Sequence, residues 1–202
     1  MELLKSVRLG VWMGLSCLGL TVPIAQANVF TTPRLVAPGE FALGMEPELI
    51  SSGGVGLGVN LRYTQGLTDS NNWYAFLGTG GGSRQFRAGG AFTFDIFPDV
   101  GNQPGIGIAV QAQFVQISSI GTVEISGIPY IHKQFEPQGF RFDPFLAIPI
   151  GLALAQGQYQ VISTLAVGSN FKHSDHLSST VEVGIGLSHS THYVSGGVSY
   201  YH

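Results

Sequence analysis

Hydrophobic and polar residues alternate along much of the chain with a period of two, the pattern of a β-strand whose two faces meet different surroundings. Residues 55–63 show this most clearly, because Val, Leu and Tyr occupy the odd positions and Gly, Asn and Arg occupy the even positions. The same alternation returns in residues 92–96, 106–111, 122–126 and 181–187. No segment carries a convincing helical period, so the pattern predicts an all-β protein.

Groups of Gly, Asn, Asp, Pro and Ser separate these runs and supply the residues that hairpin turns require. Nine such groups divide residues 39–202 into ten predicted strands, mostly of 10–16 residues. A tilted strand needs about 9–11 residues to cross the apolar zone of a bilayer, so these lengths suit a membrane. Pro144 and Pro149 remove two ladder donors from the seventh strand, which predicts a bulge or local opening there. A division into eight strands is the alternative count.

The composition extends this prediction to the surroundings of the sheet. Charged residues make up 10% of the chain, against about 25% in ordinary soluble domains, and the mean hydropathy is +0.25. No apolar run of 18 residues follows residue 27, so helices are not expected to span a membrane. An open sheet in lipid would leave backbone groups without hydrogen-bond partners, so the sheet has to close. We therefore predict a transmembrane antiparallel up-and-down β-barrel in residues 39–202.

In such a barrel the apolar positions face acyl chains and the polar positions face the lumen. Applied to the alternating segments, this rule predicts a polar network in the lumen that contains charges of both signs. Its members are Glu46, Glu48, Arg62, Arg87, Asp95, Glu124, Arg141, Asp143 and Glu182.

The first 27 residues have the order of a secretory signal peptide. Lys5 and Arg8 give a short basic region, residues 9–20 are mostly apolar, and an Ala-Gln-Ala group of small side chains ends at Ala27. The apolar region is shorter than the roughly 20 residues that a membrane-spanning helix needs. The sequence therefore predicts cleavage after Ala27, followed by an N-terminal extension over residues 28–38.

Removal of the signal peptide changes both the cysteine content and the charge. The only cysteine, Cys17, lies in this peptide, so the mature chain contains no disulfide. Of 9 basic and 12 acidic residues, 7 and 11 remain, which gives a formal charge of −4. A nucleic-acid-binding protein would carry a basic surface, so nucleic acid is not an expected partner.

With its signal peptide, its Gly-rich alternating strands and an aromatic end, the chain resembles the small bacterial outer-membrane β-barrel proteins. Tyr193, Tyr200 and Tyr201 mark that end, although these families usually finish on Phe and this chain finishes on His202. The resemblance implies a place in the cell outer membrane, with outer-membrane lipids and the barrel assembly machinery as partners. Such families include structural barrels, narrow pores and lipid-modifying enzymes.

The lengths of the predicted turns favour some of these functions over others. If both termini are periplasmic, the extracellular turns are short and the longer connections, residues 97–105 and 170–176, are periplasmic. Adhesion and receptor functions depend on long outer loops. We therefore expect a structural or narrow-pore function without enzymatic activity and without a cofactor.

Two alternatives to this function remain open. His189 and Ser190 are weak candidates for the catalytic pair of a lipid-modifying hydrolase, with Glu182 as the orienting carboxylate, and are loosely similar to the His–Ser pair of outer-membrane lipid A deacylases. A soluble periplasmic barrel that binds a small apolar ligand would instead place its apolar positions inward. His173 and His176 have a metal-ligand spacing but lie on a predicted turn, so no metal site is expected.

Overall fold

The computed structural model describes residues 35–82, 85–117 and 119–202, so the predicted signal peptide and residues 28–34 of the predicted extension lie outside the described residues. None of the helical segments described there is long and apolar enough to span a membrane. The elements are β1 (Phe41–Ile50), β2 (Gly56–Thr68), β3 (Asn71–Gly80), β4 (Phe86–Phe97), β5 (Gly105–Ile117), β6 (Ile120–His132), the 3-10 helix η1 (Pro137–Gly139), β7 (Arg141–Ala147), β8 (Ile150–Ala155), β9 (Gln158–Lys172), β10 (Leu177–Ser188) and β11 (Tyr193–Tyr201).

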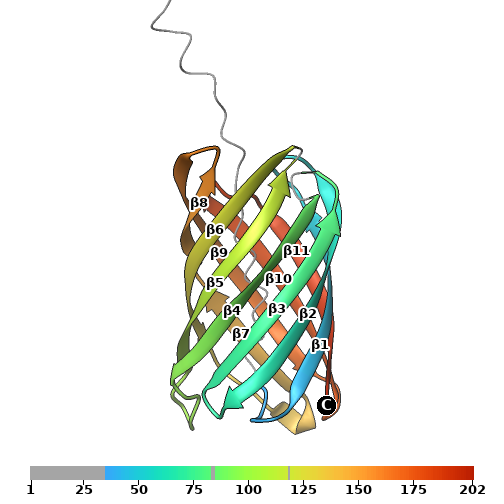
Figure 1. The fold of residues 1–202 in the computed structure, drawn as a ribbon. Coiled ribbons are helices and arrows are strands. Elements are labelled where there is room, and N and C mark those ends of the chain that lie inside the picture. Colours follow the sequence, from blue (N-terminus) through green and yellow to red (C-terminus); the bar gives the residue numbers. More distant parts are fainter. Residues whose placement is uncertain (1–34, 83–84, 118) are drawn as a thin grey trace, which may run out of the picture.

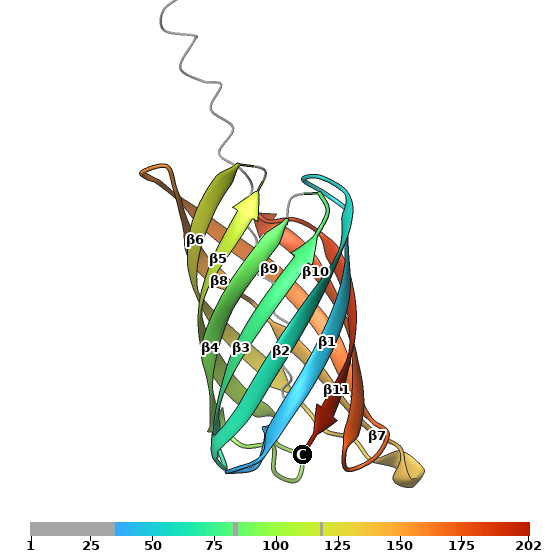
Figure 2. The same cartoon turned by 45° about the vertical axis from the view of Figure 1, so that its right-hand side comes forward.

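The strands form one closed antiparallel barrel in which consecutive strands pair, except that β7 and β8 each pair with β6 and β9 and not with each other (Figures 1 and 2). Closure comes from the pairing of β1 with β11. At this seam the backbone N–H of Phe41 donates to the carbonyl of His202 at 3.0 Å, and the N–H of His202 donates back at 2.9 Å. The predicted up-and-down barrel is therefore confirmed.

The seventh barrel strand is divided into two pieces, β7 and β8, which lie end to end between β6 and β9. The interruption falls at Ile148 and Pro149, where the proline has no N–H for the ladder. Pro144 stays inside β7, where it pairs with Ser169. With these two pieces taken as one strand the barrel has ten strands, not eight, and the opening predicted at the prolines occurs at Pro149 alone.

Apolar side chains cover the outside of the barrel, and every strand contributes at least one. Soluble proteins rarely expose continuous apolar surface of this extent, whereas a bilayer covers it. The lumen contains buried polar and charged residues, so the structure contradicts the alternative of a soluble barrel with an apolar interior. Exposed examples, one from each strand in chain order, are Leu43, Leu61, Leu77, Phe92, Val110, Ile125, Leu146, Leu152, Val167, Val183 and Val194.

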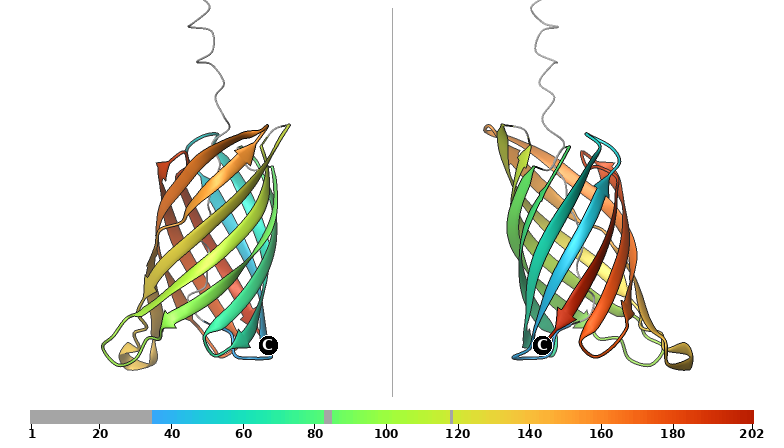
Figure 3. Two further views of the ribbon diagram at one scale, coloured as in Figure 1. Left: turned by 60° about the vertical axis from the view of Figure 1, so that its left-hand side comes forward. Right: turned by 90° about the vertical axis from the view of Figure 1, so that its right-hand side faces the viewer.

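The two ends of the barrel differ in the length of their connections. The end that holds Phe41 and the C-terminus, called the terminal mouth from here on, carries the connections over residues 98–104 and 133–140, the second of which contains η1 (Figure 3). At the opposite end the β8–β9 and β10–β11 connections span only residues 156–157 and 189–192. The longer connections therefore lie on the side of the C-terminus. The long connection predicted over residues 97–105 is confirmed, whereas the one predicted over residues 170–176 is shorter, since β9 extends to Lys172 and leaves only residues 173–176.

A row of aromatic rings crosses the seam of the barrel at the terminal mouth. Phe41 lies 5.1 Å from the His202 ring and 5.8 Å from Tyr63, and Tyr63 lies 5.4 Å from Trp73. Rings of this kind gather at the interfaces of membrane barrels, where an apolar body and a polar tip both find suitable surroundings. The row therefore marks one expected membrane interface.

Candidate functional site

An arginine–glutamate pair occupies the middle of the lumen. Arg62 on β2 donates from Nε to Glu46 Oε1 at 2.6 Å and from Nη2 to Glu46 Oε2 at 3.2 Å, and both side chains are buried. The guanidinium carbon also lies 4.4 Å from the centre of the Tyr74 ring. A two-point contact of this kind fixes both side chains in one geometry.

A second arginine reaches across several strands. Arg87 on β4 donates to Glu48 Oε2 on β1 at 2.8 Å and also to Asn60 on β2. Strands β2 and β3 separate β1 from β4, and neighbouring strands lie about 4.8 Å apart, so this ion pair spans three strand spacings. The pair therefore crosses the lumen as a chord instead of lying along the wall.

Further contacts occupy the lumen near these pairs. The hydroxyl of Tyr74 on β3 donates to Gln111 on β5 at 2.8 Å, which bypasses β4. Gln113 donates to Glu124 at 2.6 Å, and Tyr193 donates to Glu182. We call the charged residues of this level the midsection network. They are Glu46, Glu48, Arg62, Arg87, Glu124 and Glu182, all buried.

One part of the lumen wall, where β5, β6, β7 and β9 lie side by side, is apolar, in contrast to the expected polar lining. Ala109, Ile128, Tyr130, Ala147 and Ala166 form one buried cluster there. The inward and outward positions of β6 alternate without a break, but an apolar residue, Ile128, takes an inward position, while Gly127 and Pro129 take the outward positions that an apolar side chain would fill. Small alanines on this wall leave space for the larger side chains that the polar wall extends into the lumen.

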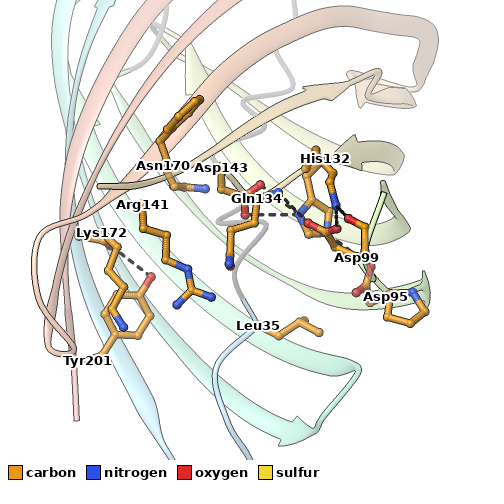
Figure 4. Close-up of a pocket in the computed structure, with 15 residues that line it drawn as sticks. Leu35, Asp95, Asp99, His132, Gln134, Arg141, Asp143, Asn170, Lys172 and Tyr201 are labelled. Carbon is orange, nitrogen blue, oxygen red and sulfur yellow. Dashed lines mark hydrogen bonds and ion pairs between the residues drawn. The ribbon is translucent and has the colours of Figure 1, made fainter. Parts of the chain in front are cut away.

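A cavity of about 590 Å³ opens within the terminal mouth (Figure 4). Its lining is rich in charge of both signs, and it includes three residues predicted for the lumen network, Asp95, Arg141 and Asp143. The structure thus separates these three from the midsection network. The titratable residues that line the cavity are Asp95, Asp99, His132, Lys133, Arg141, Asp143, Lys172 and Tyr201.

His132 lies between two carboxylates on one side of this cavity. Its Nδ1 is 3.2 Å and 3.3 Å from the two oxygens of Asp143, and its Nε2 is 3.8 Å from Asp95 Oδ1. The first contact has hydrogen-bond geometry and the second is a longer electrostatic contact. His132 therefore contacts Asp143 directly and separates it from Asp95.

Asp99 holds the connection between β4 and β5 against the connection that follows β6. It accepts hydrogen bonds from the ammonium group of Lys133 and, at 2.6 Å, from the backbone N–H of Gln134. Lys133 also donates to the carbonyl of Gly101 at 2.7 Å. Burial acts to raise the pKa of Asp99, but the hydrogen bonds from Lys133 and Gln134 and the charge of Lys133 outweigh it, so the pKa lies below its ordinary value.

The three weak catalytic candidates are not brought together. Glu182 accepts a hydrogen bond from Tyr193 inside the lumen, whereas His189 and Ser190 lie in the connection after β10. Ser188 lies six positions after Glu182 on extended β10, which corresponds to about 20 Å at about 3.4 Å per position. The carboxylate therefore cannot orient a histidine at this turn.

The histidines of the other turn make ordinary local contacts. His173 Nε2 lies 2.7 Å from the Ser179 hydroxyl, and His176 Nδ1 donates to the backbone carbonyl of Tyr201 at 2.9 Å. In the part of the chain that the structure describes, no group of three or more His, Cys, Asp or Glu residues is placed to hold a metal ion.

We call the cavity at the terminal mouth the vestibule. The sequence analysis did not predict it. Its missed members include His132, Asn170 and Lys172, which lie at or near the ends of strands. The inward positions of β6 run from Thr122 through Glu124 in steps of two, so the same phase carried to the last residue reaches His132. The signal was therefore present in the alternation but was not followed into the turns.

A closed barrel with an apolar outer face and a polar lumen defines the chain as a transmembrane β-barrel. Comparison with family models and with curated proteins finds no match. Among solved structures, the chain is similar to a barrel from the de novo design of transmembrane β-barrels, with 14% identity, a TM-score of 0.43, and coverage of 84% of this chain and 100% of that chain. It is also similar to the KdgM porin, with 14% identity, a TM-score of 0.39, and coverage of 79% and 98%.

Proposed function

We propose that the protein is an integral outer-membrane barrel with a structural function, whose lumen is bridged at its middle and does not form an open diffusion path. The apolar outer face supports contact with membrane lipids, and the predicted signal peptide supports export. Insertion then depends on the barrel assembly machinery as a partner. The proposal includes no hydrolase built on His189, Ser190 and Glu182, because Glu182 is remote from the turn that carries the other two residues.

The observation that carries the proposal is the ion pair between Arg87 and Glu48. Because it joins β4 to β1 across the lumen, solutes that move along the barrel axis meet a pair of buried charges held by each other. The Arg62–Glu46 pair and the Tyr74–Gln111 hydrogen bond add further obstacles. Ten strands enclose a lumen little wider than the eight-strand barrels that side chains fill, so a few large side chains suffice to block it.

The proposed location is tested first, with protein from washed outer membranes. Closed barrels resist SDS in the cold, so electrophoresis with and without boiling is expected to show a heat-dependent shift in mobility. Recovery of the protein in the soluble fraction, without this shift, would overturn the outer-membrane assignment.

Conductance in planar bilayers tests the closed lumen. Wild-type protein is expected to leave the bilayer sealed, while replacement of both chord residues, Glu48→Ser with Arg87→Ser, is expected to produce conductance steps. The heat-dependent gel shift, measured on both samples, controls for folding and insertion. Stable steps from the wild-type protein would overturn the structural function and establish a narrow pore.

A further inference from the structure

Two cations face each other on one wall of the vestibule. Arg141, the first residue of β7, and Lys172, the last residue of β9, are directly opposite in the strand register, and both line the cavity. Figure 4 shows both side chains on the same side of the cavity, opposite His132 and Asp99. Like charges directly opposite on neighbouring strands repel each other, so this wall favours the binding of an anion.

Neither Arg141 nor Lys172 forms an ion pair with a buried carboxylate among the described residues. Lys172 contacts Asp175 at 2.5 Å, but that carboxylate belongs to an exposed residue of the β9–β10 turn. Arg141 has no hydrogen-bond or ion-pair partner among residues 35–82, 85–117 and 119–202. A guanidinium carries five N–H donors and keeps its charge, so Arg141 retains its full capacity to bind an oxyanion.

The carboxylates of Asp143 and Asp99 have partners other than Arg141 and Lys172. Asp143 contacts His132 through both oxygens, and Asp99 binds Lys133 and the backbone of Gln134. Asp99 lies across the cavity from Arg141 (Figure 4), whereas Asp143 lies two positions after Arg141 on the same face of β7 and opposite Asn170 in the strand register. The basic wall, formed by Arg141, Lys172 and Asn170, therefore has one carboxylate beside it, and that carboxylate is already in contact with His132.

Asn170 provides an independent sign of a ligand on the basic wall. It lies two positions before Lys172, hence on the same face of β9, and it is only 7% exposed. Its Oδ1 accepts a hydrogen bond from Thr180, which leaves Nδ2 as the available group. Nδ2 has no partner among the described residues, and a buried donor without a partner is costly.

We propose that Arg141, Lys172 and Asn170 bind the oxyanion group, carboxylate or phosphate, of a small polar solute that enters through the terminal mouth. The forked guanidinium matches two oxygens of such a group, and the volume of about 590 Å³ lies in the range of small-molecule sites. Because Asp143 lies beside this wall and Asp95 lines the same cavity, a second negative charge on the ligand is repelled, while hydroxyl or ammonium groups are accepted. The ligand is thus a solute with a single anionic group.

This site is independent of the proposed closed lumen, since a solute can bind at the mouth whether or not the midsection conducts. Calorimetric titration of the full mature chain in an uncharged detergent, with inorganic phosphate and separately with acetate, tests it. At least one anion is expected to bind, and Arg141→Gln and Lys172→Gln are each expected to weaken that binding tenfold or more, since each removes a charge-assisted hydrogen bond.

Lys133→Gln is the matched control. It removes the same charge from the same cavity, but its ammonium group is already bound to Asp99 and to the carbonyls of Gly101 and Gln103, so anion binding is expected to change less than threefold. The cold-SDS gel shift verifies that each variant is folded. Absence of binding by wild type, or equal weakening in all three variants, would overturn the specific site.

A further titration separates a free solute from a lipid headgroup. Detergent micelles doped with an anionic phospholipid present phosphate groups at the membrane surface. Because the basic wall faces the lumen, phosphate or acetate is expected to bind with unchanged affinity in the doped micelles. Loss of anion binding there would mean that the headgroup occupies the wall, which would overturn the assignment to a free solute.

Discussion

The midsection of the lumen and the vestibule contain the same types of charged residue, but the two regions pair these charges differently. In the midsection, Arg62 lies against Glu46 and Arg87 lies against Glu48, with all four side chains buried. In the vestibule, Arg141 faces Lys172 and has no partner among the described residues. The midsection charges thus hold strands to one another, whereas the charges of the basic wall are available to a solute.

The largest expected difference in the free energy of unfolding is between replacement of one arginine in the midsection and replacement of one arginine in the vestibule. Arg62→Met leaves the carboxylate of Glu46 buried without its main partner, which is expected to cost about 3–5 kcal/mol. Arg141→Met breaks no internal pair and is expected to change stability by less than about 0.5 kcal/mol. Urea unfolding in lipid vesicles measures both free energies.

The double variant Glu46→Gln with Arg62→Met is the control for this comparison. It removes the orphaned charge as well as its partner, so most of the lost stability is expected to return. Equal costs for Arg62→Met and Arg141→Met would show that the two levels do not differ in the way the structure indicates.

The next largest expected effect on stability comes from side-chain packing in the midsection. An added methyl group at Gly184 would overlap the ring of Tyr193, the residue opposite it on β11, and would displace the hydroxyl that binds Glu182. Gly184→Ala is therefore expected to cost about 1–3 kcal/mol in urea unfolding. Gly127→Ala is the matched control, because the space around Gly127 is open. A neutral result at Gly184 would mean that the midsection is loosely packed.

Alternation predicted the barrel from the sequence because the period of two is a local property of each strand. It also placed Glu46, Arg62 and Glu182 in the lumen, where the structure has them. It did not predict the apolar wall around Ile128, because apolar residues there take the inward positions that the rule assigns to polar residues. Partners such as Arg87 and Glu48 belong to strands that are not neighbours, and no local pattern contains that contact.

The vestibule could not be predicted from the sequence for a related reason. Its wall combines the end of β6, the start of β7 and the end of β9, which are brought together by the pairing of β6 with β7 and of β7 with β9. The sequence pattern places Lys172 in a turn, and turns carry polar residues in any case. The sequence therefore contained the residues of this site but gave no measure of their proximity.

The pH dependence of stability tests the contacts of Asp99 in the vestibule. Asp99 has a lower pKa in the folded protein than in the unfolded chain, so its contribution to stability is complete above the unfolded value, about 4, and is lost as the pH falls through the folded value. Asp99→Asn removes this contribution and is expected to cost about 1 kcal/mol at neutral pH. Hydrogen exchange of residues 98–104 measures the local loosening.

Asp69→Asn is the control for the acid experiment, since Asp69 is an exposed turn residue at the same end of the barrel. Its exchange rates are expected to match those of wild type at every pH. If Asp99→Asn leaves residues 98–104 as protected as in wild type at neutral pH, the link between Asp99 and Lys133 does not hold that connection.

The smallest expected effect lies at the opposite end of the barrel from the vestibule. Ser190→Ala changes a residue of the β10–β11 turn, about 20 Å or more along β10 from Glu182, so no charge of the midsection acts on its hydroxyl. Stability is expected to stay within about 0.5 kcal/mol of wild type, and the acyl composition of the host membrane is expected to stay unchanged. Mass spectrometry of membrane lipids measures this acyl composition. A change in acyl chains that depends on Ser190 would place chemistry at this turn, and both levels of the lumen would then serve as the scaffold of an enzyme.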